Sequence, residues 1–203
     1  MVWDFKAAVE SAHDNDDSVS WAEFKNEDCQ KLDVSGIEFK KTVFVSCRFT
    51  DCDFTKSGFY DCTFEGCMFT GCDFSDSFWK NSAINKSRGD GCDFRESRIK
   101  ESGFTESVFR YANFSGSVMH KSVFDGCNLT QAAMSGIKLD KTDFKAVDFT
   151  GADFFTTSFK GTDLSGCLIE GISVSESCAE LKGAVVNAMQ AVEIARIIGV
   201  KVI

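Results

Sequence analysis

The chain of 203 residues has only two histidines, His13 and His120, and none of its 10 cysteines belongs to a Cys-x-x-Cys pair. Zinc sites in proteins are built mainly from His and Cys ligands at short, regular spacings, so this composition argues against a metal site. The sequence has no apolar run long enough to cross a membrane, and charged residues interrupt the segment that a signal peptide would occupy. We therefore expect a cytoplasmic protein without a metal ion or cofactor.

A catalytic set is also lacking, because no nucleophile, base and orienting group can be picked out together. We therefore expect a protein that is not an enzyme. Basic residues are outnumbered: 22 Lys and Arg stand against 31 Asp and Glu, which gives a net charge of -9 at pH 7 and a pI of about 4.8. Phosphates attract Lys and Arg, so this balance argues against nucleic acid as a direct partner.

What the sequence does contain is a large apolar residue at every fifth position, in one unbroken phase. The phase runs from Phe24 to Val174, and only Cys29 and Gly89 depart from it. Small residues form a second register two positions before these centres. The cysteines in that register are Cys47, Cys52, Cys62, Cys67, Cys72, Cys92, Cys127 and Cys167. A repeat of this length decides the fold.

A period of five fits neither regular secondary structure. On an α-helix each step of five turns the side chain by about 140° from the previous one, so no buried stripe forms. On a straight strand, steps of five alternate between the two faces. Both registers are satisfied by a short extended stretch followed by a turn in every unit. The chain must therefore coil.

The individual units resemble those of the pentapeptide repeat family, in which a small residue, then Asp or Asn, then Phe or Leu precede two polar positions. Examples are the units 52–56 (CDFTK), 72–76 (CDFSD) and 112–116 (ANFSG). The resemblance covers Ala22 to about Val174. It implies an all-β solenoid, a right-handed quadrilateral β-helix in which four pentapeptides make one coil and stacked coils lie about 4.8 Å apart.

This fold gives most cysteines a structural role, because a thiol in the small register acts as a small apolar side chain. We expect them to be reduced. Residues 1–20 form an N-terminal cap or lead: Asp4 is a candidate N-cap of a short helix whose Trp3, Phe5 and Val9 would cover the first coil. The acidic cluster at 14–17 leaves a disordered lead as the alternative. The β-helix is expected over residues 21–177.

Residues 178–203 have a different character. Asn187 is a candidate N-cap and Gly199 a stop signal, so we expect a helix between them, followed by a short strand at Val200–Ile203. The helix carries more apolar surface than one coil end needs, which suggests a two-fold partner. The expected dimerisation residues are Met189, Val192, Ile194 and Ile198. A monomeric cap is the alternative.

A β-helix closed by a helix and a short strand is similar to the topoisomerase-directed pentapeptide repeat proteins of the Qnr and MfpA type. The resemblance implies an end-to-end homodimer that imitates B-form DNA for DNA gyrase or topoisomerase IV. One difference is that many Qnr-type proteins have loops between coils that are needed for protection from quinolones. Here the phase is unbroken, and only residues 85–91, where Gly89 occupies a centre, are candidates for a bulge.

Folding the sequence at 20 residues per coil gathers carboxylates on one face. We take them as the candidate partner-binding residues: Asp33, Asp53, Asp73, Asp93 and Asp153. The alternative is that they shape turns by accepting hydrogen bonds from nearby backbone. A second column is comparatively basic and reads Lys40, Tyr60, Lys80, Lys100, His120, Asp140 and Lys160.

The length of the array also suits a DNA mimic. About seven and a half coils span roughly 36 Å, so two copies end to end would match on the order of 20 base pairs. The sequence therefore predicts a DNA-mimicking protein that binds a type II topoisomerase and modulates it or confers quinolone resistance. The alternative is a pentapeptide repeat scaffold or regulator that binds an unrelated protein.

Overall fold

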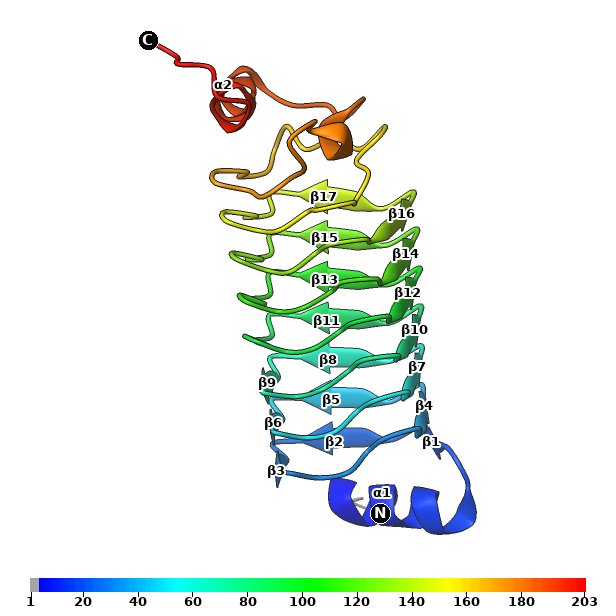
Figure 1. Cartoon of the computed structure of the whole chain (residues 1–203). Helices are drawn as coiled ribbons and strands as arrows, with labels where there is room; N and C mark the ends of the chain where they lie inside the picture. The colour runs from blue at the N-terminus through cyan, green and yellow to red at the C-terminus, as the bar shows by residue number, and fades with distance from the viewer. Residues whose placement is uncertain (1–3) are drawn as a thin grey trace.

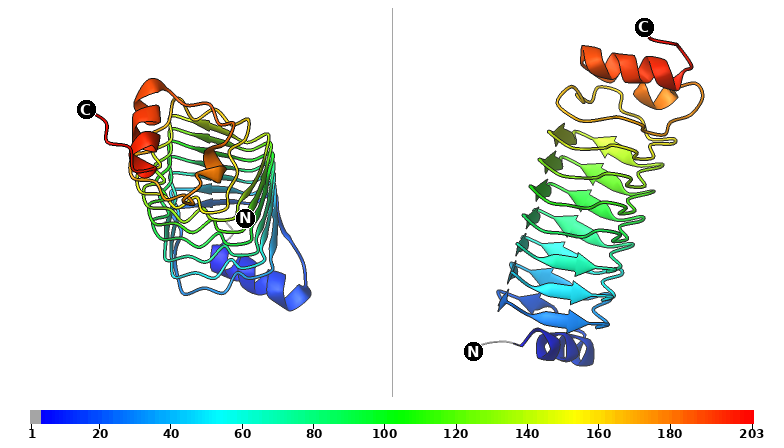
Figure 2. Two further views of the ribbon diagram at one scale, coloured as in Figure 1. Left: turned by 45° about the horizontal axis from the view of Figure 1, so that its top comes forward. Right: turned by 90° about the vertical axis from the view of Figure 1, so that its left-hand side faces the viewer.

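The computed structural model describes residues 4–203 as a rod of stacked square coils with a short helix at each end (Figure 1). The chain runs once around the rod in each coil, and all neighbouring strands are parallel. This is the right-handed β-helix that the pentapeptide pattern predicts. Viewed obliquely and from the side, the coils follow one another in a regular stack from one end of the rod to the other (Figure 2).

Two of the four faces are seven-stranded parallel sheets. The first sheet consists of β1 (Val19–Ser20), β4 (Glu38–Lys40), β7 (Gly58–Tyr60), β10 (Phe78–Lys80), β12 (Arg98–Lys100), β14 (Val118–His120) and β16 (Lys138–Asp140). The second consists of β2 (Glu23–Lys25), β5 (Val43–Val45), β8 (Thr63–Glu65), β11 (Ala83–Asn85), β13 (Gly103–Thr105), β15 (Val123–Asp125) and β17 (Asp143–Lys145).

The other two faces are less regular. The third begins with β3 (Asp28–Gln30), β6 (Arg48–Thr50) and β9 (Met68–Thr70) and continues as single bridges up to Leu168. The fourth face has bridges alone, from Asp33 to Ser173. Residues that pair between neighbouring coils are 20 positions apart in the sequence, as in Phe44 with Phe64. Each side chain therefore lies above its counterpart in the preceding coil.

The centres of the units fill the interior. Phe54, Phe74, Phe94 and Phe114 form one ladder of stacked rings, with centroid distances of 4.7, 4.9 and 4.8 Å between successive pairs. All four are buried. The residue at the end of most units has a positive φ, as in Lys41 (51°) and Asp61 (55°), and this left-handed residue makes the corner.

No loop interrupts the coils at residues 85–91. Arg88 is paired with Met68 below and with Val108 above, so the register holds through the segment. The gap that Gly89 leaves at its centre is filled by Phe109 of the next coil: a Cβ on Gly89 would overlap the Phe109 ring. The glycine therefore makes room for a neighbouring aromatic ring, and the expected bulge is not needed.

The N-terminal helix α1 (Phe5–Asn15) covers the first coil. As the sequence predicts, Asp4 is its N-cap, and the Asp4 carboxylate accepts a hydrogen bond of 2.9 Å from the Lys6 backbone. Phe5 is fully buried, with its ring 5.0 Å from that of Phe24, and Val9 is buried beside it. Trp3, which we expected in the same cap, lies outside the described residues.

At the other end, the chain leaves the coil through a 3₁₀ turn, η1 (Ala179–Leu181), and forms α2 (Ala188–Ile197). Asn187 is its N-cap, as expected. The expected strand at Val200–Ile203 is wrong: these residues are exposed and have no strand partner among residues 4–203. The tail leads away from the rod (Figure 1), so it meets no free sheet edge with which to pair.

The cysteines provide the first testable prediction. All 10 are free, and nine are buried, whereas Cys178 is half-buried. Burial raises the pKa of Cys92 to about 12 and that of Cys127 to about 11, which suppresses the reactive thiolate. In native protein treated with iodoacetamide, we expect Cys178 to be modified first and Cys72 only after unfolding, as read by peptide mass spectrometry. Rapid native labelling of Cys72 would contradict the inward register.

Candidate partner-binding surfaces

The fourth face brings the predicted carboxylates into one column. Parallel bridges join Asp33 to Asp53, Asp53 to Asp73 and Asp73 to Asp93, and the column continues through Asn113 and Ala133 to Asp153. Asp33 and Asp53 are exposed, and the others are half-buried. Near the column, Asp76, Glu96 and Glu176 occupy the adjoining corner with few cations. The fourth face is therefore the most acidic side of the rod.

Each carboxylate of the column also shapes its own turn. Oδ1 of Asp53 accepts a hydrogen bond of 2.8 Å from the Thr55 backbone, and Oδ1 of Asp73 does the same with Ser75. Asn113 makes the equivalent bond to Ser115 with its amide oxygen, at 3.0 Å. An amide oxygen therefore serves the turn as well as a carboxylate does, and Ala133 shows that the turn also forms without a side-chain acceptor. The alternative interpretation, that these side chains shape turns, is confirmed, and the partner-binding interpretation stays a prediction.

The Oδ2 atoms of the carboxylates in the column differ in their hydrogen-bond partners. Arg95 Nε donates to Oδ2 of Asp93 at 2.7 Å, and Ser135 Oγ donates to Oδ2 of Asp153 at 2.6 Å. Within residues 4–203, Oδ2 of Asp53 and of Asp73 has no hydrogen-bonding side chain. At the start of the column, hydrogen bonds from the Ser35 hydroxyl and backbone lower the pKa of Asp33. The carboxylates of Asp53 and Asp73, in the middle of the column, therefore leave Oδ2 available to a partner.

One buried amide connects the C-terminal helix to the last coil, in addition to the Asn187 side chain, whose Nδ2 donates to the Ser165 carbonyl oxygen at 2.7 Å. Gln190 is 5% exposed, and its Nε2 donates hydrogen bonds of 2.7 Å to the carbonyl oxygens of Leu164 and Cys167. Its Oε1 accepts from the Asn187 backbone, while Oδ1 of Asn187 accepts from the Gln190 backbone. The capping box of α2 is thus joined to the free carbonyls at the end of the solenoid.

We expect Gln190→Glu to release α2 from the coil. A carboxylate cannot donate to the Leu164 and Cys167 carbonyls, and leaving a buried polar group unpaired costs about 1–3 kcal/mol. Amide hydrogen exchange should therefore be faster in Gln190→Glu than in the wild type. The increase should be confined to residues 179–203, with exchange in the coils below unchanged. Equal exchange in both proteins would show that the amide does not hold the helix. Gln131→Glu, on an exposed corner, is the matched control.

Glu180 is a second anchor, in η1. It is 4% exposed; its Oε1 accepts from the Thr156 backbone at 3.0 Å, and its Oε2 accepts from the Ser175 hydroxyl at 2.8 Å. Burial acts to raise the pKa of Glu180, but these hydrogen bonds outweigh it and hold the pKa below its ordinary value. The ionised side chain therefore connects the departing chain to two segments of the last coils.

A lowered carboxylate pKa makes stability depend on pH. The contribution of Glu180 is present above the pKa of the unfolded chain and is lost as the pH falls through the folded pKa. We expect Glu180→Gln to lower the thermal unfolding midpoint at about pH 7, and the difference from wild type to shrink below about pH 4. A difference that stays constant with pH would mean that charge is not involved.

The expected dimerisation residues do not all share one surface. Met189 is 76% exposed and Ile198 56% exposed, and the apolar tail residues Val200 and Ile203 are exposed beyond them. Ile194 instead packs on the interior together with Ile197, and Val192 is half-buried. The free apolar surface is therefore made by Met189, Ile198 and the tail, and Ile194 serves mainly to attach α2.

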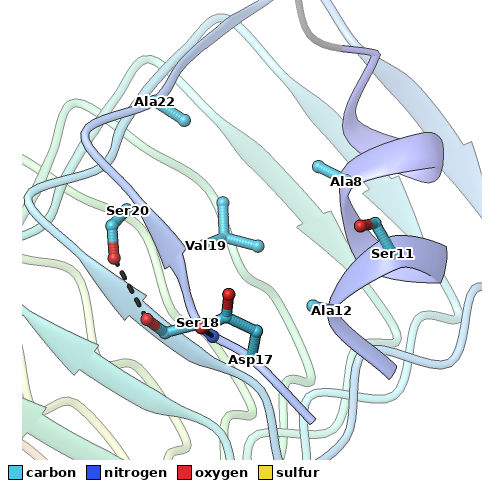
Figure 3. A pocket seen from close by; sticks show the side chains of 8 residues that line it. All are labelled: Ala8, Ser11, Ala12, Asp17, Ser18, Val19, Ser20 and Ala22. Carbon is cyan, nitrogen blue, oxygen red and sulfur yellow. Dashed lines mark hydrogen bonds between the residues drawn. The ribbon is translucent and has the colours of Figure 1, made fainter. Parts of the chain in front are cut away.

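A shallow pocket of about 190 Å³ lies between α1 and β1 (Figure 3). Its lining residues are Ala8, Ser11, Ala12, Asp17, Ser18, Val19, Ser20 and Ala22. Asp17 is the one titratable side chain among them, and its Oδ1 accepts from the Ser18 backbone at 2.7 Å. The hydroxyls of Ser18 and Ser20 contact each other at 3.1 Å. The Asp17 carboxylate is thus bonded to a backbone N–H and not to a serine hydroxyl, so the pocket shows no nucleophile hydrogen-bonded to a base.

Two further features are absent from residues 4–203. These residues contain no group of three or more His, Cys, Asp or Glu side chains placed to hold a metal ion. No helix in this part of the chain is long and apolar enough to span a membrane.

The coils and their repeating unit define a class of proteins, the parallel β-solenoids built from pentapeptides. A family model for the pentapeptide repeat region matches residues 57–134, and a model for pentapeptide repeats matches residues 37–76 and 127–171. The chain belongs to the pentapeptide repeat family. No curated protein sequence matches it.

Solved structures with the same fold include QnrB1, described as a plasmid-mediated fluoroquinolone resistance protein. A trypsin-treated QnrB1 variant is 21% identical with a TM-score of 0.50, and the match covers 92% of this chain and 98% of that one. HetL from Nostoc sp. strain PCC 7120, described as involved in heterocyst differentiation regulation, is 11% identical with a TM-score of 0.33, covering 87% and 95%. At 21% identity, the QnrB1 comparison shows the fold alone.

Proposed function

We propose that this protein binds a type II topoisomerase, such as DNA gyrase or topoisomerase IV, at the surface that otherwise holds DNA. The observation that carries the proposal is the column Asp33, Asp53, Asp73 and Asp93, in which carboxylates follow one another in register up one face. A DNA-binding surface is basic and attracts a regular line of negative charge. Binding of this kind requires no catalytic residue.

The C-terminal patch supports a two-fold arrangement. Met189, Ile198 and the exposed tail form apolar surface at the end of the rod, where a second copy would continue the column. Two rods end to end would extend the line of charge to a length on the order of 20 base pairs. QnrB1, whose description connects it with fluoroquinolone resistance, has the same fold, which makes this class of enzyme the first to test.

The test is competition on purified DNA gyrase. A fluorescent linear duplex is bound to the enzyme, and the protein is added while anisotropy is followed; supercoiling is assayed in parallel with and without a fluoroquinolone. We expect the protein to displace the duplex, less effectively as salt rises. If gyrase binds the protein and the duplex at the same time with undiminished affinity, the DNA-mimic hypothesis is wrong. The alternative, a scaffold that binds an unrelated partner, would then be favoured.

The dimer is tested separately by sedimentation. Met189→Glu places a charge in the exposed C-terminal patch and should give a monomer that keeps the β-type circular dichroism of the wild type. Thr70→Glu, an equal change of charge on an exposed position of the third face, should remain dimeric. Wild-type protein that sediments as a monomer at micromolar concentration would remove the two-fold geometry from the proposal.

A further inference from the structure

The outward side of the first sheet is basic, in contrast to the acidic chain as a whole. This sheet, β1-β4-β7-β10-β12-β14-β16, lies along one side of the rod (Figure 1). We call its outward side chains and adjoining corner the basic face. Its cations are Lys40, Lys41, Lys80, Arg98, Lys100, Lys121, Lys138 and Lys141, and its acids are Glu38, Asp61, Glu101 and Asp140. Positive charge therefore predominates locally.

Most of this positive charge is free. Lys40 pairs with Glu38 at 2.6 Å, and Lys121 approaches Glu101 at 3.9 Å. His120 contacts Asp140 at 2.6 Å. By contrast, four cations on β10, β12 and β16 have no carboxylate within 4.0 Å among residues 4–203. These are Lys80, Arg98, Lys100 and Lys138. Lys80 and Lys100 stand on the adjacent strands β10 and β12, so their backbone positions are about 4.8 Å apart; Arg98 is also on β12, and Lys138 is on β16.

Aromatic side chains accompany these cations. The repeat directs nearly all rings inward, yet Tyr60 and Phe78 extend from neighbouring strands of the basic face, with ring centroids 5.5 Å apart. The Tyr60 ring lies over Gly58, since a Cβ there would be 2.7 Å from Tyr60 Cε2. The absence of a side chain at Gly58 thus leaves the space that the Tyr60 ring occupies. Further along the same face, Lys41 Nζ lies 4.1 Å from the ring of Trp21, which is 75% exposed.

Free cations beside rings on a flat sheet are the pattern by which proteins hold single-stranded nucleic acid. The cations attract the phosphates, and unpaired bases stack on the rings whatever their sequence. A duplex keeps its bases stacked inside and cannot use the rings, and an acidic peptide would use the cations alone. We propose that the basic face binds single-stranded nucleic acid, with Tyr60 and Phe78 as the stacking platform and Lys80, Arg98 and Lys100 as phosphate contacts.

Binding of nucleic acid to this face differs from the expectation based on net charge. An overall charge of -9 argues against nucleic acid as a direct partner only if the charge is spread evenly. Here the fourth face carries much of the negative charge, while the first sheet carries an excess of cations. The proposal does not depend on topoisomerase binding, because it concerns a different face and a different ligand.

The test uses the full chain and a fluorescein-labelled oligo(dT) of about 20 nucleotides, titrated by anisotropy. We expect binding at about 50 mM salt that weakens steeply by about 200 mM. Tyr60→Ala combined with Phe78→Ala should weaken binding by about tenfold or more. Lys80→Gln combined with Lys100→Gln should weaken it too, and should reduce the slope of log affinity against log salt by roughly 0.7 per lost phosphate contact.

The controls separate this face from general attraction to a polyanion. Tyr111→Ala and Lys86→Gln remove an aromatic and a cation from other parts of the surface and should leave the affinity unchanged. Circular dichroism checks that each variant is folded, and the lysine variants leave the ring platform intact. The proposal is overturned by absence of binding at low salt, or by equal affinity for duplex. It is also overturned if a labelled poly-glutamate peptide binds as tightly and is insensitive to the aromatic substitutions.

Discussion

Phe94→Ala is expected to destabilise the protein by about 3–5 kcal/mol, the cost of truncating a fully buried aromatic side chain. The Phe94 ring is stacked between those of Phe74 and Phe114, and it also contacts Phe104 and Phe109 edge-on, at 6.1 and 5.7 Å. Its removal leaves a cavity in the middle of the rod, where neither end cap can move in to fill it. Urea unfolding monitored by circular dichroism measures the loss.

The comparison variant is Phe155→Ala. Phe155 is 53% exposed on the outside of the fourth face, so its removal should change the stability by only a few tenths of a kcal/mol. The two changes delete the same atoms from the same solenoid and differ in which way the ring points. A loss below about 1 kcal/mol for Phe94→Ala would mean that the assignment of inward and outward positions is mistaken.

The solenoid could be predicted from the sequence because every coil repeats the same five-residue pattern. A large apolar centre and a small residue two positions earlier both point inward, and neither a helix nor a straight strand can satisfy that pattern. The register of the acidic column follows from it, since a 20-residue coil places Asp53 above Asp33. The caps of both helices could also be predicted, because Asp4 and Asn187 satisfy free backbone groups locally.

The end of the rod could not be predicted in the same way. Gln190 and Glu180 are polar residues that periodicity treats as exposed, yet both are buried because they satisfy backbone groups left open where the repeat stops. Beyond Gly199, the apolar sequence has β-propensity but no strand edge within reach, so it stays extended and exposed. The burial of Gln190 and Glu180 and the lack of a strand after Gly199 depend on which backbone groups the fold places near these residues.

Only some of the side-chain arrangements on the basic face could be predicted from the sequence. The column containing Lys40, Lys80 and Lys100 is evident from the 20-residue spacing. The pairing of Tyr60 with Phe78 is not, because it crosses between two columns and requires the space left by Gly58. A tyrosine two positions after a glycine on an outward strand face is the signal that would have indicated it.

Replacing Asp53, Asp73 and Asp93 together by Asn is expected to keep the fold and to weaken topoisomerase binding by at least about tenfold, because charge is removed while the turns remain intact. Asn113 already accepts the same backbone hydrogen bond in this column, so the amide oxygen is known to fit. The corresponding Lys variant reverses the charge and should abolish binding. Affinity is measured by anisotropy on purified gyrase at low and at physiological salt.

A triple Ala variant completes the experiment. It removes the acceptor as well as the charge, so each change should cost about 0.5–1.5 kcal/mol of stability through the lost hydrogen bond, as at Asp53 with Thr55. If the column acts only on turns, Asn will bind like wild type and Ala alone will be impaired, by unfolding. If it acts as a line of charge, Asn and Ala will lose binding alike although their stabilities differ. Full affinity in the Asn variant would therefore exclude the acidic column as the topoisomerase contact.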